Sequence, residues 1–235
     1  MISVFRWLRM LEDFLFPEPP YCPFCGEAPL EELECCRRCA AQLALDWRLQ
    51  SLHGRPAASL FPYQGYVRQL IRQMKYHGAY RIGLALGALL GRALQETPEL
   101  APVNLLVPVP LHPARRRQRG FNQAEALVQG IRTHWQRPVF TGVMRLKDSP
   151  SQSGLALEER RANVRHAFAV TADANLKEKT CLIVDDVVTS GSAVLAVART
   201  LEDLGARCAV VSAARAVLEK NAGNPKDSCG RCRHW

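Results

Sequence analysis

Long apolar runs are missing from this sequence of 235 residues. A membrane-spanning helix needs about 18 consecutive apolar residues, and no stretch approaches that length. The first sixteen residues contain four charged side chains and no small-residue cleavage site, which argues against a secretion signal. Their apolar residues recur every three to four positions and predict a short amphipathic helix instead. We therefore expect a cytoplasmic protein with no membrane span.

Internal repeats and low-complexity tracts are also lacking, and aromatic residues make up only 7% of the chain. The hydrophobic share of 48% and the charged share of 23% are ordinary for a folded protein and exclude a disordered one. The length fits one large domain or two small ones. The function must therefore be sought in local motifs.

Positive charge is concentrated in the middle of the chain. The formal net charge is +9, and residues 108–170 contain 11 basic and 4 acidic side chains. A localised positive field attracts polyanions such as nucleotide phosphates, pyrophosphate or nucleic acid, although a merely solvated basic face is the alternative. Four arginines within five positions form the densest part of this stretch, namely Arg115, Arg116, Arg117 and Arg119.

Two Cys-x-x-Cys pairs lie close together near the N-terminus. Cys22 and Cys25 form the first pair, and ten residues separate it from the second, Cys36 and Cys39. In a reducing compartment clustered cysteines more often hold a metal than a disulfide. Four thiolates suit tetrahedral Zn²⁺ and leave no coordination position open for chemistry. The spacing predicts a structural zinc site, with Cys35 as an alternative to Cys36.

A third Cys-x-x-Cys pair, Cys229 and Cys232, stands close to the C-terminus. Two thiols are half a zinc site, and completion would require Cys35, His234 or another chain. The surrounding Gly-, Asn- and Lys-rich sequence favours a flexible tail over residues 221–235. We place a zinc-finger module with its N-terminal helix in residues 1–50 and the main domain in residues 51–220.

Short β-branched runs alternate with helical patterns in the second half of the chain. Because continuous apolar strands joined by helices are typical of buried parallel sheets, we predict an α/β fold whose mostly parallel sheet has helices on both faces. Residues 67–94 read as helix broken at Gly78 and Gly83, and residues 47–62 read as a linker or an irregular entry into a second domain. The expected strands are 103–109, 139–145, 180–185 and 207–213, and the expected later helices are 123–135 and 192–204.

The segment from 181 to 193 carries the most specific chemistry. A buried strand delivers Asp185 and Asp186 to its carboxyl end, and a hydroxyl-rich turn then opens a helix. Backbone N–H groups at such a helix start, together with the helix dipole, form a cradle for one phosphate. The two carboxylates are better suited to accept hydrogen bonds from vicinal sugar hydroxyls. This pattern predicts a site for a ribose 5-phosphate group.

This run resembles the phosphoribosyl pyrophosphate (PRPP) motif of type I phosphoribosyltransferases. More narrowly, the chain from Cys22 to about Ala214 resembles the ComF/GntX family, in which a zinc finger precedes a phosphoribosyltransferase-like domain. Besides the cysteine pairs and the PRPP motif, the resemblance rests on residues 74–78 (Met-Lys-Tyr-His-Gly), 107–111 (Val-Pro-Val-Pro-Leu), 119–123 (Arg-Gly-Phe-Asn-Gln), Gln152, Arg160 and Asn163.

The resemblance implies a role for each part of the site. Asp185 and Asp186 would hold the ribose hydroxyls and are the candidate catalytic carboxylates, while Mg²⁺ would bridge the pyrophosphate and the ribose. Residues 147–163 would form a flap over the site. The pyrophosphate loop would comprise Pro110 and Leu111, followed by the arginines Arg115, Arg116, Arg117 and Arg119. The PRPP-binding run would continue after the acid pair through Val187, Val188, Thr189, Ser190, Gly191, Ser192 and Ala193. At the last of these positions the family usually has threonine in place of Ala193.

Two functions are compatible with this resemblance. The first is an enzyme that transfers phosphoribose from PRPP in nucleotide or gluconate-linked metabolism. The second is a competence protein that binds a phosphoribosyl ligand and handles single-stranded DNA during natural transformation, in company with a helicase. Single-strand binding favours a basic groove with interleaved aromatic residues, and here Phe121 and Trp135 stand near basic residues. Whether turnover occurs is left open by the sequence.

Overall fold

The computed structural model describes residues 21–28, 34–146, 167–171 and 175–216. The expected N-terminal amphipathic helix, the flap at 147–163 and the cysteine pair Cys229 and Cys232 lie outside these residues. Within the described part of the chain, no helix is long and apolar enough to cross a bilayer.

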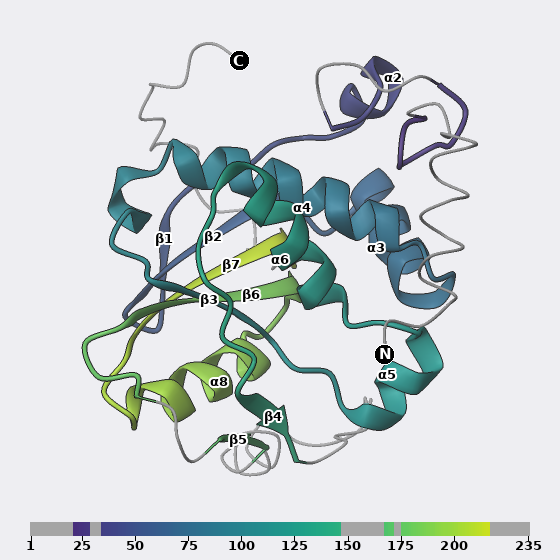
Figure 1. The fold of residues 1–235 in the computed structure, drawn as a ribbon. Coiled ribbons are helices and arrows are strands. Elements are labelled where there is room, and N and C mark those ends of the chain that lie inside the picture. Colours follow the sequence, from purple (N-terminus) through teal and green to yellow (C-terminus); the bar gives the residue numbers. More distant parts are fainter. Residues whose placement is uncertain (1–20, 29–33, 147–166, 172–174, 217–235) are drawn as a thin grey trace, which may run out of the picture.

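A five-stranded sheet forms the centre of the molecule, in the order β1-β2-β7-β6-β3 (Figure 1). Only β1 runs antiparallel to its neighbour, and the other three pairings are parallel. The predicted mostly parallel sheet is therefore confirmed. The strands comprise Gln50–Leu52 (β1), Arg55–Pro62 (β2), Leu105–Pro108 (β3), Thr180–Val188 (β6) and Arg207–Arg215 (β7).

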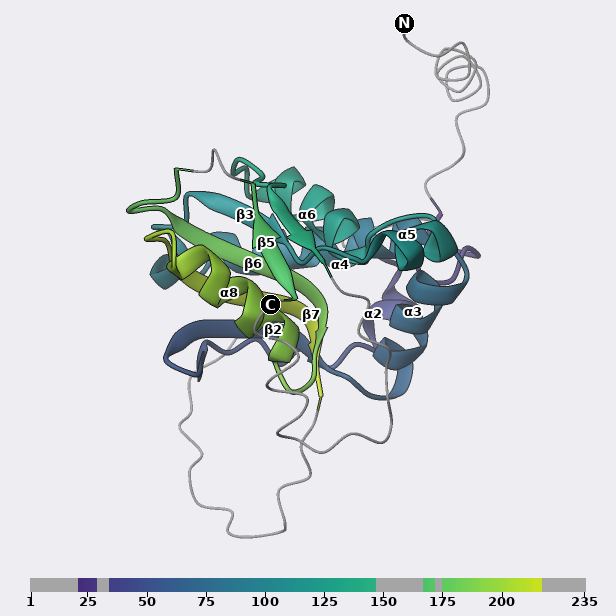
Figure 2. The same ribbon diagram turned by 90° about the horizontal axis from the view of Figure 1, so that it is seen from below.

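Helices cover both faces of this sheet (Figure 2). Side chains of β6 alternate between the faces, as strand geometry requires: Leu182 and Val184 join the core beneath α3, α4 and α6, while Ile183 joins the core beneath α8. The helices comprise α2 (Arg37–Ala40), α3 (Gly65–Tyr76), α4 (Tyr80–Gln95), α5 (Pro113–Arg119), α6 (Gln123–His134) and α8 (Ser192–Glu202), with a short 3-10 turn at Pro98–Leu100.

Glycines let α4 and α6 pack with their backbones nearly in contact. A Cβ atom at Gly87 would lie 2.2 Å from the carbonyl oxygen of Leu127, and one at Gly130 would lie 2.1 Å from that of Leu84. Gly78, with a positive φ, does separate α3 from α4. Gly83 does not break a helix as predicted, because it lies inside α4, where a Cβ would clash with Ala126 at 2.7 Å.

Two other expectations about secondary structure are corrected. Residues 47–62 are not a linker, because they contain the β1–β2 hairpin, and β2 pairs with β7 inside the main sheet. The strand expected at 139–145 divides in two. Val139 makes an isolated bridge to Leu106, whereas β4 (Val143–Arg145) pairs with β5 (Phe168–Val170) in a separate two-stranded sheet. Strand β6 also continues past its expected end at Asp185 to Val188.

Candidate functional site

The carboxyl ends of β3 and β6 meet at one edge of the sheet. Pro108 is paired with Val184, and the Val109 amide donates to the Val184 carbonyl at 2.9 Å. This register places the chain after β3 directly beside Asp185 and Asp186. Ligands of open parallel sheets bind at such an edge.

A pocket of about 160 Å³ opens there. Seven of the predicted site residues line it, from the acid pair, the pyrophosphate loop, α5 and the start of α8: Asp185, Asp186, Pro110, Leu111, Arg115, Arg119 and Ala193. The remaining lining residues, to which the sequence analysis assigned no role in the site, are Lys75, Val109, Asn122, Gln123, Ala124 and Arg145.

The two carboxylates have different surroundings. Asp186 is buried, and its Oδ2 lies 2.9 Å from the Lys75 ammonium at the end of α3. The half-buried Asp185 accepts a hydrogen bond from the Asp186 amide at 2.9 Å. Burial, and next the neighbouring Asp186 charge, raise the pKa of Asp185 to about 7, although Lys75 and Arg145 act in the opposite direction. Asp185 therefore exchanges its proton close to neutral pH.

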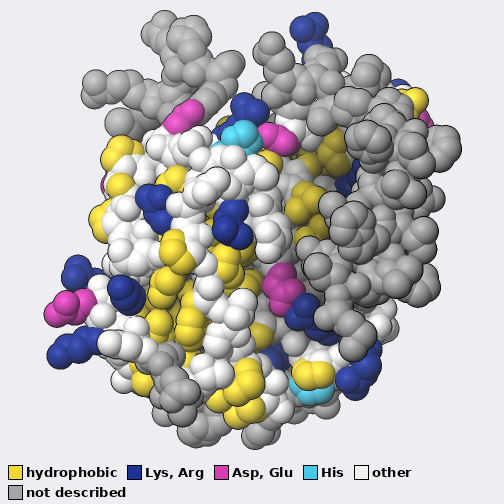
Figure 3. Space-filling view, in the orientation of Figure 1, with side chains coloured by type: hydrophobic (Ala, Val, Ile, Leu, Met, Phe, Trp, Pro, Cys, Tyr) yellow, Lys and Arg dark blue, Asp and Glu magenta, His cyan; other side chains and the backbone are white. Residues whose placement is uncertain are grey.

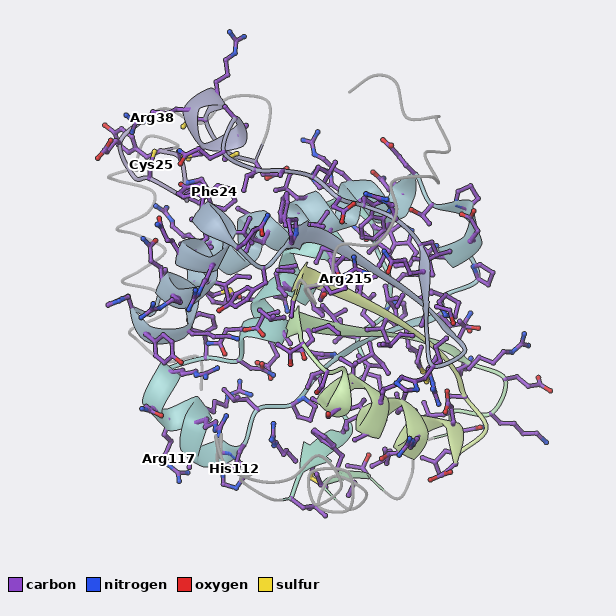
Figure 4. The ribbon with its side chains drawn as sticks, turned by 180° about the vertical axis from the view of Figure 1, so that it is seen from behind. Phe24, Cys25, Arg38, His112, Arg117 and Arg215 are labelled. Carbon is purple, nitrogen blue, oxygen red and sulfur yellow. The ribbon has the colours of Figure 1, made fainter. Side chains whose placement is uncertain are left out.

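The four arginines of α5 do not act as one group. Arg115 and Arg119 are four residues apart, on one face of the helix, and both line the pocket half-buried. Arg116 instead makes a two-bond contact with Glu125, at 2.7 and 2.8 Å. Arg117 is exposed on the outer side of α5 (Figure 4), where basic side chains gather on the surface (Figure 3). Two of the four arginines are thus directed at the pocket.

Asn122 and Gln123 fix the helical wall of the pocket. The buried Asn122 donates to the Val109 carbonyl at 3.0 Å and accepts from the Ala124 amide at 3.1 Å, so it both caps α6 and ties it to the end of β3. Gln123 accepts a hydrogen bond from Arg119 at 3.0 Å, which orients that guanidinium. An asparagine directly before a helical pattern is a typical N-cap, so the sequence alone could have predicted that Asn122 caps α6.

The turn after β6 has the shape of a helix start. Gly191 adopts a positive φ of 75° just before α8, a conformation that favours glycine. Ser190 and Ser192 place their hydroxyl oxygens 2.6 Å apart, and both residues are exposed together with Thr189. Of the predicted PRPP-binding run, Val187 and Val188 lie within β6, paired with Ala214 and Arg215. Only Asp185, Asp186 and Ala193 of that run line the pocket.

Lys75 is the site residue that sequence reasoning missed most clearly. It belongs to the Met-Lys-Tyr-His-Gly run that contributed to the family resemblance, but the residues beside it in the sequence do not indicate which group its ammonium contacts. It reaches Asp186 because α3 is anchored by Leu70, Ile71 and Met74, all fully buried. His112, by contrast, accepts the Ala114 amide at 3.3 Å and caps α5, consistent with a structural role.

The four predicted zinc ligands come together in the N-terminal module. The sulfur atoms of Cys22, Cys25, Cys36 and Cys39 lie within 4.8 Å of one another, and the Cys25–Cys36 separation is 3.8 Å. Tetrahedral Zn–S bonds of about 2.3 Å require sulfurs about 3.8 Å apart, so the cluster fits Zn²⁺. Cys36 rather than Cys35 belongs to it.

Backbone groups favour the thiolate form of Cys25 in this cluster. The Cys36 amide donates to Cys22 Sγ at 3.3 Å, and backbone hydrogen bonds, above all that of Glu27, lower the pKa of Cys25 to about 6. The thiolate is the form that binds metal. Burial raises the pKa of both Cys35 and the cluster member Cys39 to about 12, so Cys35 is distinguished only by its position outside the group of four sulfurs.

The comparisons with known proteins agree with this arrangement. The phosphoribosyl transferase domain family matches residues 118–230, a stretch that includes the acid pair and the start of α8. Together with the fold, this match defines a phosphoribosyltransferase-type domain that follows a four-cysteine module.

Curated relatives narrow the class further. Competence protein F of Haemophilus influenzae is 29% identical over 79% of this chain and 80% of its own. DNA utilization protein YhgH of Escherichia coli is 30% identical over 79% of each chain, and Competence protein ComFC of Bacillus subtilis is 27% identical over 81% of this chain and 75% of its own. The chain belongs to this ComF/YhgH family.

A solved structure, an orotate phosphoribosyltransferase of Mycobacterium tuberculosis, overlaps 74% of this chain and 78% of its own at 15% identity, with a TM-score of 0.33. The family assignment rests on the sequence relatives and not on this distant likeness.

Proposed function

We propose that the pocket at the ends of β3 and β6 binds a phosphoribosyl ligand such as PRPP. The observation that carries this proposal is the meeting of the acid pair with Arg115, Arg119 and the start of α8 around one cavity. Carboxylates suit sugar hydroxyls, and guanidinium groups suit phosphate oxygens. A ligand that carries a sugar and phosphate groups would use both kinds of side chain.

Each end of the ligand has its own partners in this proposal. The 5-phosphate lies at the start of α8, where Thr189, Ser190, Gly191 and Ser192 offer hydroxyl and amide donors and the helix dipole adds positive potential. The ribose hydroxyls face Asp185 and Asp186. The pyrophosphate lies against Pro110 and Leu111, between Arg115 and Arg119.

Asp185 and Asp186 would hold Mg²⁺, which would supply positive charge to offset that of the ligand's phosphates. The oxygen-rich donor set beside it, the two carboxylates, is of the kind that Mg²⁺ accepts. In a transfer reaction the protein's own task would be to hold the sugar and neutralise the leaving group. Asp185 and Asp186 are the carboxylates that line the pocket among the residues the structure describes, so a proton-accepting role would fall to them. Asp185, whose pKa burial raises to about 7, is the first candidate.

We further propose that this protein handles single-stranded DNA in DNA uptake, alongside a helicase. Relatives named for competence and DNA utilization support this role. An aromatic and basic surface also adjoins the pocket. Tyr76 is 66% exposed, with the Arg119 guanidinium 5.7 Å from its ring centroid, and Tyr80 packs edge-on against Phe121 at 5.1 Å. Exposed rings beside arginines suit base stacking, whereas Trp135 is buried and has a packing role.

Calorimetry with PRPP and Mg²⁺ tests the ligand proposal. The wild type should give a saturable binding heat, and the double variant Asp185→Asn with Asp186→Asn should lose it. Asp203→Asn, an exposed change at the far end of α8, is the matched control and should bind as the wild type does. Equal heats in the double variant and the wild type, with both folded, would refute the assignment.

A further inference from the structure

The cysteine cluster is in contact with hydrogen-bonding groups from two parts of the chain. The first part is the cysteine module itself, where the Cys36 amide donates to Cys22 Sγ at 3.3 Å and backbone groups bond to Cys25. The second part is α3. The hydroxyl of Tyr66, 27 residues beyond Cys39, lies 3.1 Å from the sulfur of that cysteine. The surroundings of the four sulfurs therefore include a side chain that the module does not supply.

Tyr66 is held in place on both sides along the chain. Just before it, the Tyr63 amide donates to the Arg215 carbonyl at 2.7 Å, which fixes the end of β2 beside β7. Just after it, Val67 is buried in the same hydrophobic core that contains Cys39. The hydroxyl thus reaches the sulfur from a helix whose position the core determines.

The chemistry of a zinc ligand decides the direction of this hydrogen bond. A cysteine that binds zinc is a thiolate, so it has no proton to donate and can only accept. A tyrosine hydroxyl keeps its proton at neutral pH and can donate. Hydrogen bonds to ionised groups are stronger than those between neutral groups, and groups that bond to a metal ligand orient it and increase metal affinity.

We propose, given the structural zinc site described above, that Tyr66 is part of that site. Its hydroxyl donates to the Cys39 thiolate and holds this sulfur toward the metal. Tyr66 contacts a ligand and not the metal, so it is a positioning residue. The site is then shared between the cysteine module and α3. Because a coupling between two equilibria acts equally in both directions, zinc binding and the docking of the module on α3 stabilise each other.

Metal competition on the full chain tests this proposal. Tyr66→Phe keeps the ring and removes only the hydroxyl. Its zinc affinity, measured against a chelator of known affinity, should fall by about tenfold or more, as expected when a partner of a metal ligand is removed. Tyr63→Phe is the matched control, because Tyr63 is also half-buried and packs against the same core. The control should bind zinc as the wild type does.

Cobalt spectra distinguish a hydrogen bond from a packing effect. Co²⁺ bound by thiolates absorbs light through charge transfer from sulfur to metal, and a hydrogen bond to the sulfur stabilises the electrons that are transferred. The charge-transfer band of Tyr66→Phe should therefore move to longer wavelength, while that of Tyr63→Phe stays in place. Replacement of tyrosine by 3-fluorotyrosine, a stronger donor, should move the band to shorter wavelength in a chain with no substitution. This last measurement decides the matter even if Tyr66→Phe fails to fold.

The outcomes separate the role of Tyr66 from the zinc site itself. Wild-type zinc affinity and an unmoved cobalt band in Tyr66→Phe would overturn the role of Tyr66 and leave the zinc assignment intact. A weaker zinc affinity with an unmoved band would assign the effect to packing and would also refute the hydrogen bond. Wild-type protein that binds neither metal would overturn the zinc assignment, and this inference with it.

Discussion

The hydroxyl of Tyr66 lies 3.1 Å from Cys39 Sγ, so the first turn of α3 contacts the four-cysteine cluster. The last turn of the same helix carries Lys75 to Asp186. Glu34 adds a second attachment, with its carboxylate 2.8 Å from His134 of α6 and 3.3 Å from Arg92 of α4. The cysteine module is thus fastened to α3 and α4 and, through His134, to α6, although the cluster lies at the opposite end of the molecule from α5 (Figure 4).

Metal content tests the cysteine cluster. Protein purified without added zinc should contain about one zinc per chain. Cys22→Ser should lose the metal and lower the melting temperature, because such modules draw much of their folding free energy from it. Cys35→Ser is the matched control, since Cys35 is as buried as Cys22 and stands next to Cys36 in the sequence but lies outside the cluster. Loss of zinc from the Cys35 variant and not from the Cys22 variant would contradict the ligand set.

The division among the α5 arginines predicts unequal effects on pyrophosphate binding. Arg115→Ala and Arg119→Ala should each weaken binding by roughly tenfold or more, since a hydrogen bond to a charged group contributes about 1.5–3 kcal/mol. Arg117→Ala, an exposed change on the same helix, should leave the dissociation constant within about twofold. Calorimetry with inorganic pyrophosphate measures all three. Equal losses of affinity in the three variants would indicate that the arginines act only through their overall positive charge and that Arg115 and Arg119 make no specific contacts with pyrophosphate.

The alanine at position 193 predicts a gain of function. Ala193 lines the pocket, at the position where the family resemblance described above implies a threonine. Ala193→Thr should strengthen binding of ribose 5-phosphate by roughly fivefold, because one added hydrogen bond contributes about 1 kcal/mol. Ala193→Val has nearly the same shape without the hydroxyl and should give no gain. If both variants bind alike, the effect is steric and the phosphate is not at this helix start.

The raised pKa of Asp185 predicts a pH-dependent stability. Between its ordinary value near 4 and about 7, the folded protein keeps a proton that the unfolded chain has released. The contribution of Asp185 therefore favours folding at low pH and is lost as the pH rises through 7. Asp185→Asn removes this dependence, so the variant's melting temperature relative to wild type should be higher at pH 8 than at pH 5. A difference that does not change with pH would show that Lys75, Arg145 and the hydrogen bond from the Asp186 amide hold Asp185 at its ordinary pKa.

The surface around Tyr76 predicts salt-sensitive binding to single-stranded DNA. Fluorescence anisotropy with a labelled oligonucleotide should show binding at low salt that weakens steeply as salt increases. Tyr76→Ala should reduce the affinity by about tenfold, within the range for one stacked base, whereas Tyr76→Phe should retain it. Wild-type protein that does not bind at low salt would refute the DNA proposal.

The parts predictable from the sequence are those whose signals are local. The apolar run 181–184 identified β6, and the spacing of four cysteines identified the cluster without ambiguity except at Cys35. The hairpin of β1 and β2 was missed because Gly54 and two prolines resemble a loop, and the pairing of β2 with β7 joins residues about 150 positions apart. Gly83 was misread because the need for close helix packing is visible only once Ala126 lies against it.

The candidate site was likewise predictable only where its signals are local in the sequence. Asp185, Asp186 and the arginines were visible as a motif and a charge cluster, but which arginines face the pocket depends on the orientation of α5. Lys75 and Arg145 lie far from the acid pair in the sequence, and only tertiary packing brings them to it.

The most direct test of the central claim is a crystal structure of the protein grown or soaked with PRPP. We expect difference density in the pocket with the 5-phosphate at residues 189–193, the ribose hydroxyls at Asp185 and Asp186, and the pyrophosphate between Arg115 and Arg119. Clear density for the protein, with the Lys75–Asp186 contact unchanged and no ligand in the pocket at saturating PRPP, would contradict it.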